Sequence, residues 1–71
     1  MWEILEKPLQ IYNIVNEYVG SYVAISFKDS GSAEGRLVKI DWLRFGLTWP
    51  DSDVIMNFWL SDIENIRRIE G

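Results

Sequence analysis

Two spacings of hydrophobic residues divide the chain into a helical part and a part made of strands. Between residues 8 and 19 apolar residues recur at intervals of three and four, as they do on one face of a helix. These positions are Leu9, Tyr12, Val15 and Val19. Pro8 begins the run, at a position where its missing N–H costs no hydrogen bond. The pattern predicts an amphipathic helix over residues 8–18 that ends near Gly20.

From Tyr22 onward the spacing changes to two, which is typical of a half-buried strand. Val23, Ile25 and Phe27 alternate with small or polar residues, and Asp29-Ser30-Gly31-Ser32 supplies a turn. The same alternation, interrupted by further turn residues, continues to the end of the chain. It predicts five strands, at residues 21–28, 32–42, 44–49, 54–60 and 65–69.

The second of these strands changes its apolar phase from Ala33 and Leu37 to Val38 and Ile40, which predicts a bend or bulge close to Gly35. A strongly bent strand closes a small barrel. The expected fold class is therefore mostly β, with an N-terminal α-helix followed by a five-stranded, strongly bent antiparallel SH3-like barrel. The fourth strand is apolar on both faces, so we expect it to be covered on both sides.

Length and composition allow one folded domain over residues 1–71. The chain is 48% hydrophobic and 25% charged, which excludes a disordered protein. A domain of this size buries only about 60% of its unfolded surface. The sequence has no Cys and no His, so disulfides and zinc cannot add stability. Oligomerisation is the remaining source, and further copies of the chain are the expected partners.

The formal net charge of -4, from 7 basic and 11 acidic residues, argues against duplex DNA as a partner, because phosphate contacts favour a basic face. Single-stranded RNA is compatible with it, because bases also stack on aromatic side chains. No segment approaches the roughly 18 apolar residues of a membrane helix, and the N-terminus lacks the basic start of a signal peptide. We therefore expect a soluble, cytoplasmic protein with no membrane partner.

A linked series of residues resembles the first motif of the Sm-like family, which includes the Lsm and Hfq proteins. The series runs from the hydrophobic strand through a small turn to Gly35, Leu37 and Asp41, and Lys7-Pro8-Leu9 is similar to the family's entry to its helix. The resemblance covers about residues 7–69 and implies the Sm fold. It also implies a homo-oligomeric ring of roughly five to eight subunits, joined through the fourth and fifth strands, and RNA binding by the loop that follows Asp41.

The sequence departs from the family pattern at three places. Eukaryotic and archaeal members carry a base-contacting Asn four residues after the Asp, where this chain has Phe45. The second motif, usually Arg-Gly or Lys-His, falls at about Asn57-Phe58. Leu43 stands where members often place a stacking ring. The candidate RNA-binding residues are Asp41, Trp42, Leu43, Arg44, Phe45 and Asn57.

Each candidate also has a structural interpretation. Asp41 can be a turn residue whose carboxylate accepts bonds from nearby backbone N–H groups. Trp42 and Phe45 can be core or interface aromatics, with Arg44 simply solvated. The candidate subunit interface comes from the fourth and last strands. One of its members, Phe58, can instead be a core residue. The members of this interface are Val54, Ile55, Met56, Phe58, Trp59, Ile66, Arg67 and Ile69.

The residue types indicate a binding protein and not an enzyme. Without His or Cys the usual acid-base and nucleophilic groups are missing. No cofactor or metal is expected, because Asp51 and Asp53 alone lack the oxygens of a calcium site. The leading hypothesis is a Sm-like ring-forming protein that binds single-stranded RNA in RNA metabolism or regulation. The alternative is a homo-oligomeric protein-interaction scaffold of Sm-like fold without RNA binding, and a third is a monomeric SH3-like or Tudor-like barrel that recognises a peptide.

Overall fold

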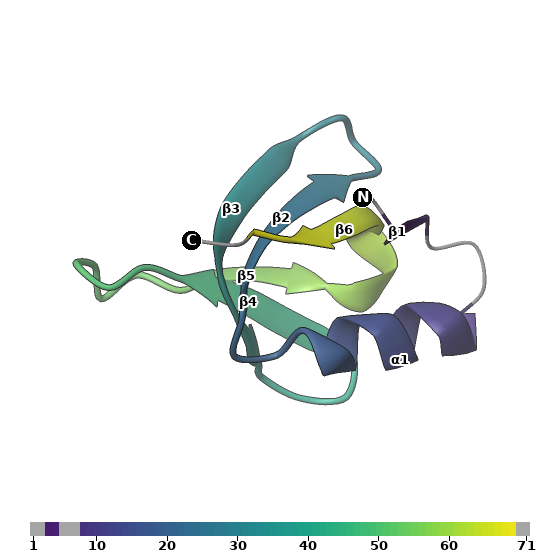
Figure 1. The fold of residues 1–71 in the computed structure, drawn as a ribbon, viewed down its shortest axis with the longest axis horizontal. Coiled ribbons are helices and arrows are strands. Elements are labelled where there is room, and N and C mark those ends of the chain that lie inside the picture. The colour runs from purple at the N-terminus through teal and green to yellow at the C-terminus, as the bar shows by residue number, and fades with distance from the viewer. Residues whose placement is uncertain (1–2, 5–7, 70–71) are drawn as a thin grey trace.

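The computed structural model describes residues 3–4 and 8–69, which form one helix and a single antiparallel sheet (Figure 1). In chain order the elements are β1 (Glu3–Ile4), α1 (Pro8–Glu17), β2 (Tyr22–Phe27), β3 (Ser32–Lys39), β4 (Arg44–Thr48), β5 (Met56–Trp59), the 3-10 turn η1 (Leu60–Asp62) and β6 (Ile63–Arg68). The strands lie in the order β1-β6-β2-β3-β4-β5. In Figure 1 the helix lies along the lower edge of the sheet.

The mostly β architecture, a helix followed by five antiparallel strands, is confirmed. The barrel closure that we expected is not, because the sheet is open, with β1 and β5 as its end strands. The strand β1, which pairs with β6, was not predicted. A strand of two residues is too short to show an alternating pattern in a sequence.

Of the bend or bulge predicted close to Gly35, the bulge is absent. The pairing of β2 with β3 runs without interruption from Tyr22↔Arg36 to Ser26↔Ser32, and the irregularity lies on the other side of β2, between Ser26 and Phe27 in its pairing with β6. The glycine at position 35 instead permits close packing of the backbone. A Cβ atom there would lie 3.1 Å from the Thr48 carbonyl oxygen and from the Trp49 ring, so glycine lets β4 and its Trp pass close to β3.

The second predicted strand is too long at its end, which accounts for Ile40 in the apparent change of phase, whereas Val38 lies within β3 and is partly buried. β3 ends at Lys39, and Trp42 belongs to the connection to β4. Within β3 the buried positions Gly35 and Leu37 keep a strict alternation. The apolar Ile40 and Trp42 therefore lie in the connection between β3 and β4, where a period of two does not apply.

A single core lies between α1 and the concave side of the sheet. Ile11 and Val15 enter it from the helix, at a four-residue spacing that places both on one face. The sheet contributes the largest fully buried side chains, which are Phe45, Ile25, Leu37, Leu47, Ile63, Ile66 and Val23. Across the core, Phe27 and Phe58 meet edge to face with their ring centroids 5.2 Å apart.

The fourth strand after the helix, β5, is covered on one face only, so the expectation of cover on both sides is not met within one chain. Phe58 and Leu60 are buried. On the outward side, Ile55 is 49% and Trp59 53% exposed, because no element of the described chain lies over them.

No helix among residues 3–4 and 8–69 is long and apolar enough to cross a membrane.

Candidate nucleic-acid interface around the β3–β4 connection

Asp41 fixes the shape of the β3–β4 connection. Its Oδ1 accepts hydrogen bonds from the backbone N–H groups of Leu43 (3.0 Å) and Arg44 (2.9 Å). The Arg44 carbonyl oxygen in turn accepts bonds from the N–H groups of Ile40 and Asp41. An Asp at the start of a turn favours this arrangement, since its short carboxylate reaches the N–H groups two and three residues on. The structural role considered for Asp41 from the sequence is what the geometry shows.

The same carboxylate forms an ion pair with the Arg44 side chain. Arg44 Nε donates to Asp41 Oδ2 at 2.8 Å, and Arg44 Nη2 lies 2.7 Å from that oxygen. The bond from the Arg44 side chain, and then the bond from the Leu43 N–H, lower the pKa of Asp41 below its ordinary value of 3.8. Both side chains are about half exposed, so water screens the pair and its effect on stability is small. Its consequence is geometric, because it holds the guanidinium beside the connection.

Trp42 projects from the tip of this connection and stacks on a residue of the helix. Its ring is nearly parallel to that of Tyr12, with an angle of 12° and 5.4 Å between centroids. Trp42 is nevertheless 72% exposed. One face of the indole therefore rests on Tyr12, and the opposite face is open to a flat ligand.

Lys39 completes this aromatic pair with a positive charge. Its Nζ lies 5.1 Å from the Tyr12 ring centroid and 5.7 Å from that of Trp42. It also donates to the Tyr12 hydroxyl at 3.0 Å. This bond, with a weaker one from the Asn16 side chain, lowers the pKa of Tyr12 below 10.0. Helix, strand and loop thus join in one cluster of two rings and an ammonium group, which we name the Trp42 cluster (Tyr12, Lys39 and Trp42).

Contact between a cation and a ring is a repeated feature of this surface. Arg36, Lys39, Arg44 and Arg68 lie over aromatic rings of described residues, with the cationic atom 5.1 to 5.7 Å from the centroid. The pairs are Arg36 with Tyr22, Lys39 with Tyr12 and Trp42, Arg44 with Trp59, and Arg68 with Tyr18. Each exposed pair is worth about 0.5–1 kcal/mol. Together they orient long basic side chains that would otherwise move freely.

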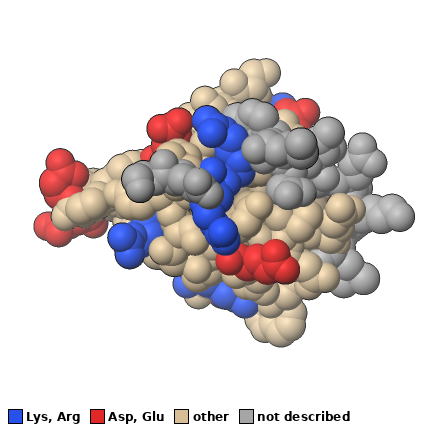
Figure 2. Space-filling model, viewed as in Figure 1, with Lys and Arg blue, Asp and Glu red and all other residues tan. Residues whose placement is uncertain are grey.

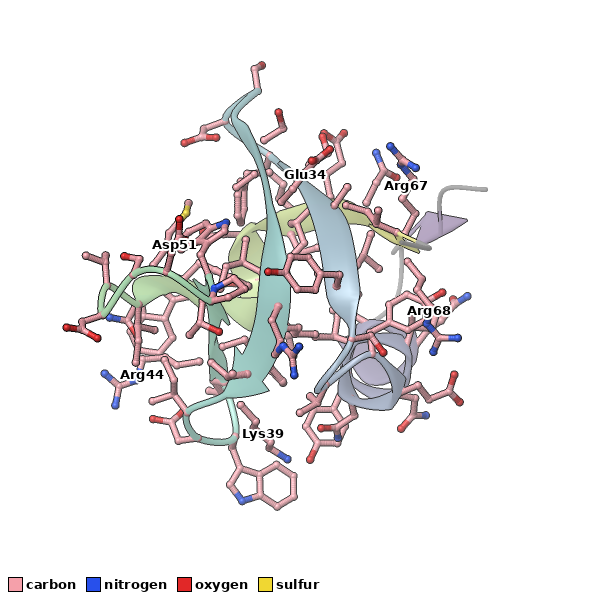
Figure 3. All side chains as sticks on the ribbon, turned by 60° about the vertical axis from the view of Figure 1, so that its left-hand side comes forward. Glu34, Lys39, Arg44, Asp51, Arg67 and Arg68 are labelled. Carbon is pink, nitrogen blue, oxygen red and sulfur yellow. The ribbon has the colours of Figure 1, made fainter. Side chains whose placement is uncertain are left out.

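Charge is segregated along the strands. Lys39, Arg44 and Arg68 lie at the end of β3, the start of β4 and the end of β6. The opposite ends of the same three strands are flanked by acidic residues: Asp29 before β3, Asp51 and Asp53 after β4, and Asp62 and Glu64 at the start of β6. The basic side chains of Lys39 and Arg44 lie away from Glu34 in Figure 3, and the acidic β4–β5 connection forms the left tip of Figure 2. Lys39 and Arg44 thus lie at one end of β3 and β4, where the carboxylate of Asp41 offsets one of the two positive charges.

The structure distributes the predicted RNA-binding residues unevenly. Trp42, Arg44 and the 57% exposed Leu43 lie together on the connection, and Asp41 braces it. Asn57 is exposed on β5, paired with Gly46 of β4. Phe45 has no exposure at all. Phe45 is therefore a core residue, which is one of the two roles that the sequence left open for it. In the folded chain it cannot contact a ligand.

The predicted interface residues also separate into two groups. Val54, Ile55, Met56 and Trp59 are exposed, between 37% and 64%. Phe58 and Ile66 are buried in the core of the chain itself, because they take the inward phase of β5 and β6. Arg67 and Ile69 are partly buried.

Tyr12 and Lys39 were not among the candidates, and Trp59 was assigned only to the interface. The period of the helix marked Tyr12 as an apolar position, although its hydroxyl end reaches solvent beside Lys39. The relevant signal in the sequence was weak: a Lys three residues before an exposed Trp. Trp59 reaches the site through its register with Arg44, which only strand pairing reveals.

A hollow also lies beside β5, apart from the Trp42 cluster. It is a pocket of about 500 Å³ lined by Phe27, Lys28, Asp29, Met56, Phe58 and Asp62. Its two carboxylates are engaged locally, since Asp29 accepts from the Gly31 N–H at 2.9 Å and Asp62 accepts from the Trp59 N–H at 3.3 Å. No group of three or more potential ligand side chains within the described residues could hold a metal ion.

Comparison with known proteins finds no match for this chain: no protein-family model, no curated protein and no solved structure matches it.

Proposed function

We propose that this chain is a Sm-like, ring-forming protein that binds single-stranded RNA through the Trp42 cluster and Arg44. The observation that carries the proposal is the open face of Trp42, which is 72% exposed while its other face rests on Tyr12. A base stacked on such a ring gains about 1–3 kcal/mol. Single-stranded nucleic acid binders combine a stacking ring of this kind with a nearby cation.

Charged groups around the ring suit a polyanion better than the net charge suggests. Lys39 lies 5.7 Å from the Trp42 ring centroid, and Arg44 follows two residues later in the chain. Either side chain is within reach of the phosphates that flank a stacked base. Phosphate contacts of this kind make binding dependent on salt.

Assembly through β5 is the second part of the proposal. β5 is an end strand of the sheet, and the apolar side chains of Val54, Ile55 and Trp59 beside it are at least 49% exposed. An open, apolar edge strand tends to pair with another chain. The helix followed by five antiparallel strands is the order of elements that the Sm-like resemblance implies, and a ring would place several Trp42 clusters on one assembly.

Fluorescence anisotropy with short labelled U-rich and A-rich RNAs, at low and at physiological salt, tests the RNA-binding part. We expect binding at low salt that weakens as salt rises. Light scattering on the same samples gives the number of subunits. Absence of RNA binding at low salt by an assembled ring would refute the first part.

One observation favours the alternative, a homo-oligomeric scaffold without RNA binding. Phe45 occupies the position of the family's base-contacting Asn and is fully buried, so no polar base reader stands there. In this case the exposed side chains of β5 would still drive assembly. This function requires an intact oligomer that binds neither RNA at low salt.

A further inference from the structure

One edge that a ring needs is already occupied within the chain. Glu3 pairs with Ile66 and Ile4 with Asn65, both antiparallel, so β1 lies along the middle of β6 on the side away from β2. At the other end of the sheet, no described strand lies beyond β5. Pairing of β5 with β6 of the next copy therefore meets one open edge and one covered edge.

The charges along β5 and β6 favour an antiparallel arrangement of these two strands between copies. The start of β5 follows Asp53, and its end lies beside Arg44, the register partner of Trp59. β6 has the same order of charges, with Glu64 near its start and Arg68 at its end. Antiparallel pairing brings Asp53 toward Arg68 and Arg44 toward Glu64. Parallel pairing would bring Asp53 toward Glu64, and like charges side by side are unfavourable.

From these observations we infer that β1 is an edge cap that competes with β5 of a second copy for the same stretch of β6. This inference rests on the ring assembly proposed above. Two main-chain groups cannot occupy one edge of Asn65 and Ile66 at once, so β1 must leave before the neighbouring chain pairs there. Assembly then exchanges a pairing within the chain for a pairing between chains.

The lengths of the two competitors determine the direction of this exchange. β1 contributes two residues, whereas β5 contributes four and carries the exposed Ile55 and Trp59 beside it. The cap has the advantage of being tethered, with an effective concentration in the millimolar range. It is thus strong enough to keep dilute protomers apart and weak enough to yield in a closed ring, where every β6 gains a longer partner.

A disulfide across the register pair of β1 and β6 provides the test. The variant with Ile4→Cys and Asn65→Cys places the two thiols at facing positions, and the chain has no other Cys. Oxidation at low protein concentration favours the bond within one chain, and a non-reducing gel identifies chains joined to one another. The mass of the assembly is then measured by light scattering as protein concentration rises, with and without reductant.

We expect the oxidised variant to stay monomeric at concentrations where its reduced form assembles like the original chain. The single variants Ile4→Cys and Asn65→Cys are the matched controls and should assemble equally with and without reductant. An oxidised variant that assembles as well as its reduced form would overturn the cap, while leaving the proposed ring intact. That result includes pairing of β5 with β5 of a second copy, which does not use β6.

A second variant opens the cap. Pro cannot donate a ladder hydrogen bond, so Glu3→Pro with Ile4→Pro should release β1 and allow assembly at a concentration about tenfold lower, the effect of one or two lost hydrogen bonds. Circular dichroism on heating verifies that the variant is folded. If neither this variant nor the original chain assembles at any concentration, the ring and the cap are both refuted.

Discussion

Arg44 and Trp59 are register partners on β4 and β5, and the Arg44 guanidinium carbon lies 5.6 Å from the centroid of the Trp59 ring. The same guanidinium donates to Asp41. One cation thus connects the brace of the β3–β4 connection to the edge strand of the sheet. The proposed RNA site and the proposed assembly surface meet at this residue.

Replacing Arg44 by Lys separates the charge of this residue from the planar shape of its guanidinium. A Lys ammonium keeps the charge but lacks the planar fork that contacts Asp41 and lies over a ring. We expect the pKa of Asp41 to rise toward its ordinary value of 3.8 and RNA to bind less tightly. Carboxyl titration by nuclear magnetic resonance and RNA anisotropy measure the two effects. Arg36→Lys, which changes the pair over Tyr22, is the matched control and should leave the pKa of Asp41 unchanged.

Trp42→Ala should weaken RNA binding without unfolding the domain. Loss of one stacking ring costs about 1–3 kcal/mol of binding free energy, which is a change of about 5- to 150-fold in the dissociation constant. Because the side chain is 72% exposed, the free energy of unfolding should fall by only about 1 kcal/mol, through loss of the contacts with Tyr12 and Lys39. Trp42→Phe should retain most of the affinity. Equal affinities for the Ala variant and the original chain would exclude Trp42 as the stacking platform.

The pH dependence of stability should carry a signature of Asp41. Its pKa in the folded chain lies below the ordinary value of 3.8, so the unfolded chain takes up its proton first as pH falls. The contribution of Asp41 is therefore complete above pH 3.8 and is lost as pH falls through the folded-state pKa. Urea unfolding across the acid range measures it. The difference in unfolding free energy between the original chain and Asp41→Asn should shrink in this window, and a constant difference would contradict the assignment.

Phe45→Leu distinguishes a core residue from a ligand contact. Phe45 is fully buried, and a shape change in a packed core costs about 1–3 kcal/mol of unfolding free energy. The fraction that remains folded should bind RNA with unchanged affinity. Denaturant unfolding and anisotropy below the unfolding transition measure the two quantities. A loss of affinity at unchanged stability would reverse the assignment.

Gly35→Ala should destabilise the sheet although alanine is otherwise well tolerated. The new Cβ would lie 3.1 Å from the Thr48 carbonyl oxygen and from the Trp49 ring. The ring is held in place by a 2.7 Å bond from Trp49 Nε1 to the Glu34 carbonyl oxygen. We expect a loss of about 1–3 kcal/mol, measured by thermal unfolding. Gly35→Ala should cost less when introduced into Trp49→Phe than into the original chain, since the smaller ring leaves more space.

The helix and β2 were predictable because both are amphipathic. The spacing of Leu9, Tyr12, Val15 and Val19 predicts the helix, although it buries Ile11 and Val15 and leaves Val19 38% exposed. The alternation of Val23, Ile25 and Phe27 predicts β2, and all three side chains are buried. Closure of the sheet was not predictable in this way. It depends on which edges meet in space, and no local period records that.

The candidate site was predicted in part for a similar reason. Asp41 and Arg44 interact at a separation of three residues, which a sequence displays directly. The contact of Trp42 with Tyr12 spans thirty positions, and that of Arg44 with Trp59 depends on the β4–β5 register. Phe45 was assigned both roles because a phase of two places it in the core, while family spacing places it in the loop.

The charged residues are unevenly placed, with Asp51 and Asp53 on the β4–β5 connection, and Lys39 and the Asp41-paired Arg44 at the β3–β4 connection. A polyanion that diffuses toward the subunit is repelled by the tip that carries Asp51 and Asp53 and attracted to the end with Lys39 and Arg44, so the field selects the orientation of approach before any contact forms. Such steering acts on the rate of association and is lost as ionic strength rises. For the RNA proposed as the ligand, steering of this kind would favour approach to the β3–β4 connection although the net charge of the chain is -4.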